Sequence, residues 1–131
     1  MNLVLIPAQP MSDHHNFHYI ELPAKDLAAT KNFYGSVFGW EFTDWGDAYV
    51  EIKGAGVEGG FALASEERQP SNQGALVILY SDDLVKSEQT VVEHGGTISL
   101  APIDFPGGRR FHFLDPSGNE LGVWTKLPIE S

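Results

Sequence analysis

The chain has 131 residues, which suits one domain that buries its own core. With 18 acidic and 8 basic residues its formal net charge is −10, and that field repels nucleic-acid phosphates and anionic lipid surfaces. The lack of cysteine excludes disulfide bonds, thiol catalysis and cysteine-based metal sites. We therefore expect no nucleic-acid partner and no membrane role. Because the apolar stretch from Leu3 to Ile6 has no cationic start and is broken by Pro7, we expect a cytoplasmic location.

The first elements are a strand and a helix. Residues 1–15 contain prolines and no sustained periodicity, so a loose leader is predicted there. Order begins near Asn16 with a short strand at 17–22. Asp26 can accept hydrogen bonds from the free amides of a helix N-terminus, and Gly39 suits the left-handed position that ends a helix. Apolar side chains at helical spacing between them form an inward stripe of Leu27, Thr30, Phe33, Tyr34, Val37 and Phe38.

Three strand-like segments follow this helix, at 40–43, 48–52 and 61–64. The segment 54–59 matches the GxGxxG pattern of dinucleotide-binding proteins, but a strand follows it where that pattern needs a helix. We therefore interpret it as a glycine-rich turn. Residues 65–74 are polar and are predicted to link the two halves of the chain.

The second half repeats this order. An apolar strand at 75–80 leads to a helix that Asp82 or Asp83 caps and Gly95-Gly96 ends. The inward stripe of this helix consists of Leu84, Ser87, Val91 and Val92. The last strands are expected at 97–100, 109–114 and 120–125, with turns at 105–108 and 115–118.

The repeat points to a duplicated unit. Gly39 follows Asp26 by thirteen positions, and Gly96 follows Asp83 by the same interval. The sequence predicts an α+β fold of two tandem βαβββ modules that form a cup-shaped, mostly antiparallel sheet with the helices on the outside. A doubly wound parallel sheet fits worse, because several strands follow each helix in succession. The domain is expected at 16–126, with modules at about 16–64 and 75–126 and a tail at 127–131. The modules pair within one chain or swap between chains.

Two segments carry a family resemblance: ELPAKDLAATKNFYGSVFGWEF at 21–42 and FPGGRRFHFLDPSGNELGVW at 105–124. They resemble the vicinal oxygen chelate superfamily of glyoxalases, bleomycin-resistance proteins and extradiol dioxygenases. The Phe33-Tyr34 pair and the Phe38-Gly39-Trp40 step are similar to the glyoxalase-like branch related to lactoylglutathione lyase. The resemblance covers residues 16–126. It implies a small-molecule site in the cup between the modules, and a homodimer.

The same resemblance implies a divalent metal held by one ligand from the first strand and one from the last strand of each module. His18 lies at or beside the first of these positions, while the others fall near Ala64, Leu76 and Gly122. One ligand in four is too few for such a cation. We therefore expect no catalytic metal and no other cofactor, with a divalent metal as the alternative. His18 is otherwise an ordinary strand histidine.

Catalytic chemistry is expected from Glu21, Arg110 and His112. Glu21 lies in an otherwise apolar strand, where a carboxylate must be paired or near water. Strand alternation puts Arg110 and His112 on one face, where a guanidinium and an imidazole suit an anionic ligand. Glu21 or His112 would act as the general base and Arg110 would stabilise an oxyanion. In the structural alternative, the arginine pairs with Glu21 or Glu120 and the histidine bonds a carbonyl.

Further ligand contacts are expected from His18, Tyr19, Tyr49, Glu120 and Trp124. Glu120 and Trp124 share a strand face with Gly122, and Trp124 could stack on a planar ligand. A slip of one residue in strand register would reverse every face. The leading hypothesis is a glyoxalase-like protein that binds a small anionic or aromatic molecule without the usual metal. The alternatives are a metal-dependent lyase, isomerase or dioxygenase, and a non-catalytic drug-resistance or sensor protein.

Overall fold

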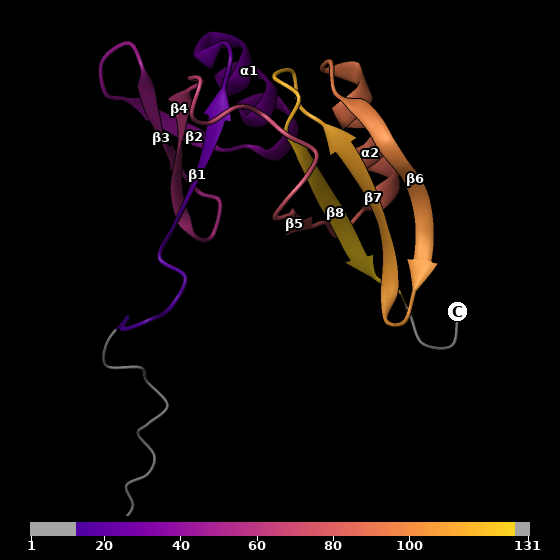
Figure 1. The fold of residues 1–131 in the computed structure, drawn as a ribbon. Helices are drawn as coiled ribbons and strands as arrows, with labels where there is room; N and C mark the ends of the chain where they lie inside the picture. Colours follow the sequence, from indigo (N-terminus) through magenta and orange to yellow (C-terminus); the bar gives the residue numbers. More distant parts are fainter. Residues whose placement is uncertain (1–12, 128–131) are drawn as a thin grey trace, which may run out of the picture.

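A computed structural model describes residues 13–127. Residues 1–12 of the predicted leader and 128–131 of the predicted tail lie outside the described residues. Strand, helix and three strands follow one another twice along the chain (Figure 1). The elements are β1 (Tyr19–Ala24), α1 (Leu27–Phe38), β2 (Glu41–Asp44), β3 (Tyr49–Lys53), β4 (Glu58–Leu63), β5 (Val77–Tyr80), α2 (Leu84–Glu93), β6 (Thr97–Phe105), β7 (Gly108–Leu114) and β8 (Glu120–Lys126).

The strands form two four-stranded sheets, ordered β1-β4-β3-β2 and β5-β8-β7-β6. In each sheet the first strand pairs with the last in parallel, and the other neighbours are antiparallel. This confirms the α+β class and the repeated βαβββ order. The sheet predicted for the two modules is built as two four-stranded sheets, one in each module, and no strand pairing among residues 13–127 joins them.

The helix ends follow the predicted capping chemistry. Asp26 accepts a 3.0 Å hydrogen bond from the amide of Ala29, and Gly39 ends α1 with φ 76°. Of the two candidate caps for the second helix, Asp83 is the one used, since its Oδ1 accepts from the amide of Lys86 at 3.1 Å. The last residue of α2 is Glu93, and His94, one position before Gly95, is its C-cap. No helix in residues 13–127 has the length and apolar character needed to cross a bilayer.

Several predicted boundaries and faces need correction. The first strand starts at Tyr19, not at residue 17, and Phe17 is 96% exposed. β4 begins at Glu58, within the segment interpreted as a turn, because Gly59 and Gly60 pair with both β1 and β3. In α2 the predicted inward residue Val92 is 54% exposed. β6 extends to Phe105. It is an edge strand that pairs only with β7, so it tolerates a proline and shifts of register.

One apolar core lies between the helices and both sheets, and α2 lies behind β6 and β7 in Figure 1. The ring of Phe33 in α1 lies 5.8 Å from that of Phe113 in β7, so the first helix packs against the second module. The ring of Tyr34 lies 5.0 Å from that of Phe61 in its own module. The core consists of Ala24, Phe33, Tyr34, Val50, Ile52, Phe61, Leu84, Val91, Phe111, Phe113, Leu121 and Val123. Packing rather than strand pairing therefore joins the two modules.

Strand alternation gives each sheet a second face. On β7 and β8, Phe111, Phe113, Leu121 and Val123 belong to the core, so the residues between them point the other way. We call the face of each sheet opposite the core its open face. The polar residues predicted to carry chemistry on these strands lie there.

Candidate functional site

The open face of the second sheet collects four of the predicted residues. The β7–β8 register places Arg110 opposite Trp124 and His112 opposite Gly122. Glu120 is two residues from Gly122 along β8, so it shares their face. The prediction that these residues lie on one face is confirmed.

A cavity of about 270 Å³ opens on this face, lined by Ile78, Phe105, Arg110 and Trp124. The indole of Trp124 meets the ring of Tyr80 edge-on at 5.0 Å and lies 6.0 Å from the ring of Phe105. The walls are thus largely aromatic and aliphatic, with a single charged group. Such a lining suits a planar molecule that carries a negative charge.

The charged group, Arg110, has no anionic partner. Its guanidinium carbon lies 5.7 Å from the ring centroid of Phe105, and its Nε is buried without a hydrogen-bond partner. Within the described part of the chain it forms no ion pair. The preceding Arg109 differs, because its Nε lies 2.5 Å from Oδ1 of Asp104 and holds the pKa of that carboxyl below its usual value. The predicted pairing of Arg110 with Glu21 or Glu120 is wrong.

His112 is held by a carboxylate. Its Nδ1 lies 3.3 Å from Oε2 of Glu120, and the hydroxyl of Ser99 donates a 2.7 Å hydrogen bond to the same oxygen. The other ring nitrogen, Nε2, is buried and has no hydrogen-bond partner within the described part of the chain. The predicted alternative, in which the histidine bonds a backbone carbonyl, is therefore wrong.

The ring of His112 lies over Gly122. A Cβ at that glycine would stand 3.1 Å from Cδ2 of the ring and 3.5 Å from Nε2. Because glycine has no Cβ, the imidazole of His112 can occupy this space. A longer side chain at position 122 would compete with His112 for this space.

The open face of the first sheet carries a different cluster. The hydroxyls of Tyr19 and Tyr49 are in hydrogen-bond contact. Burial raises the pKa of Tyr49, and its contacts with Tyr19 and with the Glu21 carboxylate raise it further. A Cβ on Gly60 would overlap the Tyr49 hydroxyl, so a glycine here also makes room for a side chain of the neighbouring strand.

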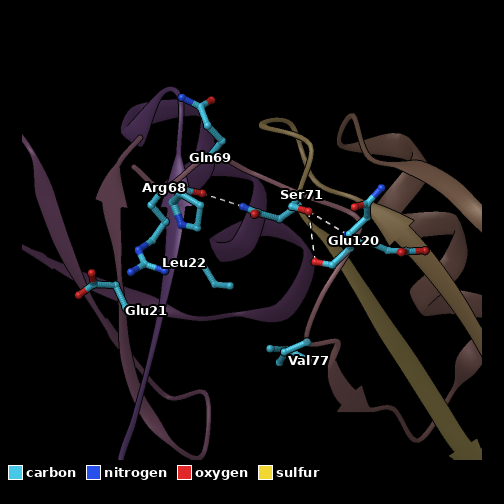
Figure 2. Close-up of a pocket in the computed structure, with 11 residues that line it drawn as sticks. Glu21, Leu22, Arg68, Gln69, Ser71, Val77 and Glu120 are labelled. Carbon is cyan, nitrogen blue, oxygen red and sulfur yellow. Dashed lines mark hydrogen bonds between the residues drawn. The ribbon is translucent and has the colours of Figure 1, made fainter. Parts of the chain in front are cut away.

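Glu21 lies in a second pocket, of about 210 Å³, between the modules. Figure 2 shows Arg68 and Glu21 on one side of this pocket and Ser71 and Glu120 on the other. The linker is held there by a 3.1 Å hydrogen bond from the amide of Glu120 to the carbonyl of Ser71. The structure thus places Glu21 and Glu120 on opposite sides of one pocket, and it does not place Glu21 in the cavity beside Arg110.

The metal positions implied by the resemblance can be tested against the strand register. Leu22 pairs with Phe61, and Leu79 pairs with Val123. Leu22 lies four residues before Asp26, the N-cap of α1, and Leu79 lies four residues before Asp83, the N-cap of α2. The two leucines are therefore equivalent, so their partners Phe61 and Val123 are equivalent, and so are the preceding residues Gly60 and Gly122. The last-strand position of the first module is therefore Gly60, and the expected position near Ala64 is wrong.

The residues at these positions do not fit a metal ion. His18 precedes β1, its side chain is 65% exposed, and its Nε2 lies 3.7 Å from Oδ2 of Asp13. Leu76, just before β5, has no donor atom, and both last-strand positions are glycines covered by a neighbouring side chain. Among residues 13–127, no three histidine, aspartate or glutamate side chains gather in a way that could hold a cation.

Four residues that contribute to these sites in the structure were not among the residues predicted from the sequence. Ile78 and Phe105 line the cavity, Ser99 fixes Glu120, and Arg68 reaches the second pocket from the linker. The alternation of β5 could have indicated Ile78. Ser99 gave no signal, because a register shift between Ile98 and Leu100 decides where its hydroxyl lies.

Comparison with known proteins gives a family and a fold. The family model described as Glyoxalase/Bleomycin resistance protein/Dioxygenase superfamily matches residues 16–123. The anthracycline biosynthesis protein DauV of Streptomyces sp. (strain C5) is 30% identical over 138 aligned positions, covering 86% of this chain and 47% of that protein. CFP32 of Mycobacterium tuberculosis, named as a glyoxylase, is 26% identical over 117 residues, covering 82% and 44%. The chain thus spans about half the length of the curated relatives it matches.

Solved structures share the architecture. A glyoxalase/bleomycin resistance protein/dioxygenase family enzyme from Burkholderia phytofirmans PsJN superposes with a TM-score of 0.73 at 19% identity, covering 83% of this chain and 97% of that one. A glyoxalase-related enzyme from Fulvimarina pelagi gives 0.71 at 20% identity, covering 86% and 88%. At these identities the likeness concerns the fold alone.

Proposed function

Since the chain belongs to the Glyoxalase/Bleomycin resistance protein/Dioxygenase superfamily, we propose that it binds a small planar organic anion in the cavity of Ile78, Phe105, Arg110 and Trp124, without a bound metal. In this proposal the anionic group lies on the guanidinium of Arg110. The planar part lies against the indole of Trp124.

The unpaired charge of Arg110 carries this proposal. In a chain with a net charge of −10, carboxylates are plentiful, yet this buried guanidinium nitrogen has none as a partner. A guanidinium forms stronger hydrogen bonds with an anionic group than a neutral donor does. The names of the relatives, for anthracycline biosynthesis and for glyoxylases, agree with a small organic ligand.

The proposal of metal-free binding has its own support. Of the four positions at which the family's metal ligands are expected, only that of His18 has a side chain that could bind a metal, and His18 lies outside the strands. His112 and Tyr49 fill the space over the two glycines. In this proposal Arg110 binds the anionic group that a metal cation would otherwise bind.

Calorimetric titration with 2-naphthoate tests the binding, with the uncharged 2-naphthamide as the ligand control. Arg110→Ala should weaken 2-naphthoate binding about tenfold or more, the value of one charge-assisted hydrogen bond. Arg109→Ala is the matched control, because that neighbouring arginine is already paired with Asp104. Equal binding of the acid and the amide, or equal loss in both variants, would refute the proposal.

A further inference from the structure

We infer that Phe105 determines the preference of the second-sheet cavity for an anion over a neutral molecule. In this inference, which rests on the proposed function, the phenyl ring holds the guanidinium of Arg110 beside the cavity and leaves its charge and its N–H groups to the ligand. Phe105 is thus a positioning residue that acts through Arg110. The ligand class is an aryl carboxylate.

Strand register makes Phe105 and Arg110 neighbours. Phe105, the last residue of β6, pairs with Gly108, and Ile103 pairs with Arg110. Because alternate residues of a strand share a face, Phe105 lies diagonally across from Arg110 on the same face of the sheet. A diagonal pair is within reach of an aromatic and a long side chain. Both residues line the cavity.

The glycine opposite Phe105 leaves room for this contact. A Cβ on Gly108 would stand 3.3 Å from Cζ of Phe105 and 3.0 Å from Cε3 of Trp124. The two rings therefore share the space over the glycine, and their centroids lie 6.0 Å apart. The end of the Phe105 ring thus lies over β7, the strand that carries Arg110.

The ring of Phe105 is the contact that holds the charge of Arg110. The guanidinium carbon lies 5.7 Å from the ring centroid, within the range of a cation–π interaction. Among residues 13–127 this guanidinium has no ion pair, and its Nε has no hydrogen-bond partner. An arginine side chain rotates about several bonds, so a ligand that had to immobilise it would bind more weakly.

Two neighbouring residues of β6 contact two neighbouring arginines of β7. Asp104 pairs with Arg109, and its carboxylate neutralises that charge and accepts hydrogen bonds from Nε and Nη2. Phe105 contacts Arg110, which points to the other face of the sheet. A phenyl ring has no charge and no oxygen or nitrogen acceptor, so it holds the guanidinium without occupying its N–H groups. Arg110, and not Arg109, therefore remains able to bind an anion.

The groups around this guanidinium indicate the ligand class. Arginine donates hydrogen bonds from a planar fork that matches the two oxygens of a carboxylate. The β7–β8 register places Trp124 opposite Arg110, so an indole adjoins the guanidinium on this face. The indole offers a flat apolar surface to an aromatic ring. An aryl carboxylate can use both groups in one molecule.

Calorimetric titration of Phe105→Leu with 2-naphthoate and 2-naphthamide tests the inference. Leucine keeps the apolar lining but has no π face, so 2-naphthoate should bind about fivefold more weakly, as expected for the loss of a partly exposed cation–π interaction. Binding of 2-naphthamide should change less than about twofold. A ring that served only as a wall of the cavity would affect both compounds equally.

Two further variants separate positioning from packing. Phe105→Met keeps a flexible apolar side chain without a ring, so it should reproduce the loss seen in Phe105→Leu. Phe105→Glu supplies the counter-ion that Arg110 lacks, and it should weaken 2-naphthoate binding about tenfold or more. Phe17→Leu is the matched control and should bind both compounds like the wild-type protein, because Phe17 is 96% exposed and does not line the cavity.

The protein without ligand gives a second readout. Nitrogen NMR relaxation of labelled arginine side chains should show the Nε–H of Arg110 as rigid in the wild-type protein and as mobile in Phe105→Leu. The Nε–H of Arg109 should be equally rigid in both proteins, because Asp104 holds it. Equal mobility of Arg110 in the two proteins would overturn the positioning role.

The outcomes separate this inference from the proposed function. If the wild-type protein prefers 2-naphthoate to 2-naphthamide and this preference is unchanged in Phe105→Leu and Phe105→Met, the inference is wrong and the proposed function stands. If the wild-type protein binds neither compound, or binds both equally, the proposed function fails and the inference fails with it.

Discussion

The hydroxyl of Tyr34 in α1 donates a 2.9 Å hydrogen bond to Oδ2 of Asp115, in the turn between β7 and β8. Both residues are buried. Oδ1 of the same aspartate accepts hydrogen bonds from the amides of Ser117, Gly118 and Asn119. One side chain of the first module is thus bound to the residue that organises a turn of the second.

Replacing Tyr34 with phenylalanine should destabilise the protein by about 1–2 kcal/mol, since Oδ2 of the buried Asp115 loses one of its two donors, the other being the side-chain amide of Asn119, while the packed ring remains. Urea unfolding measures the change. Tyr80→Phe is the control, because that side chain is 49% exposed and should shift stability by no more than about 0.5 kcal/mol. Equal midpoints for Tyr34→Phe and the wild-type protein would contradict the inter-module role.

Stability should fall at alkaline pH. Burial raises the pKa of Tyr34 well above its ordinary value, and the nearby Asp115 carboxylate raises it further. Above about pH 10 the unfolded chain loses a proton that the folded chain keeps, so the free energy of unfolding decreases as pH rises. Below that pH the contribution is fully present. Urea unfolding across this range should show a steeper decline for the wild-type protein than for Tyr34→Phe; parallel declines would count against it.

Gly122→Ala should destabilise the protein by about 1–3 kcal/mol, because the space over this glycine is filled. The new Cβ would stand 3.1 Å from Cδ2 of His112, which forces the imidazole to move by a few tenths of an ångström. Such a displacement disturbs the contact between Nδ1 of His112 and Glu120, so the urea midpoint of unfolding should fall. Gly35→Ala in α1, where the nearest atom is 3.4 Å away, is the matched control. A wild-type urea midpoint for Gly122→Ala would argue against the close packing of His112 over this glycine.

Divalent cations should not bind tightly at the family positions. Protein stripped with chelator and titrated with Zn²⁺, Ni²⁺ or Mn²⁺ should show no stoichiometric site, and His18→Ala should leave any weak binding unchanged. The reason is the donor set: one exposed histidine cannot replace the hydration shell of a cation. Tight binding that is lost in His18→Ala would show that the metal-dependent alternative is correct.

Local chemistry made much of the fold predictable. The caps at Asp26 and Asp83 follow from carboxylates placed before helical apolar periods, and Gly39 takes the left-handed conformation for which it was suited. Alternation along β7 and β8 grouped Arg110, His112, Glu120 and Trp124 correctly. These predictions succeeded because they depend on one strand or helix at a time.

The site was less predictable where it depends on contacts between strands. Glu21 was expected, as the alternative to His112, to be a general base beside Arg110, but it lines the linker pocket and not the cavity that Arg110 lines. Gly60, rather than a residue near Ala64, corresponds to Gly122, because β4 starts earlier than its glycine-rich sequence indicates. The hydrogen bond from Ser99 to Glu120 depends on a shift of strand register that the hydrophobic periodicity of the sequence does not indicate.

The amino-acid order by itself determined that the chain is a duplicated βαβββ unit and which side chains share a strand face, because capping and alternation act over a few residues. Only the tertiary structure decided that Arg110 has no counter-ion among residues 13–127, that His112 meets Glu120, and that Tyr49 and His112 fill the spaces over two glycines. Those contacts depend on strand register and on how two modules share one core, and both are set by the packing of residues far apart in the chain.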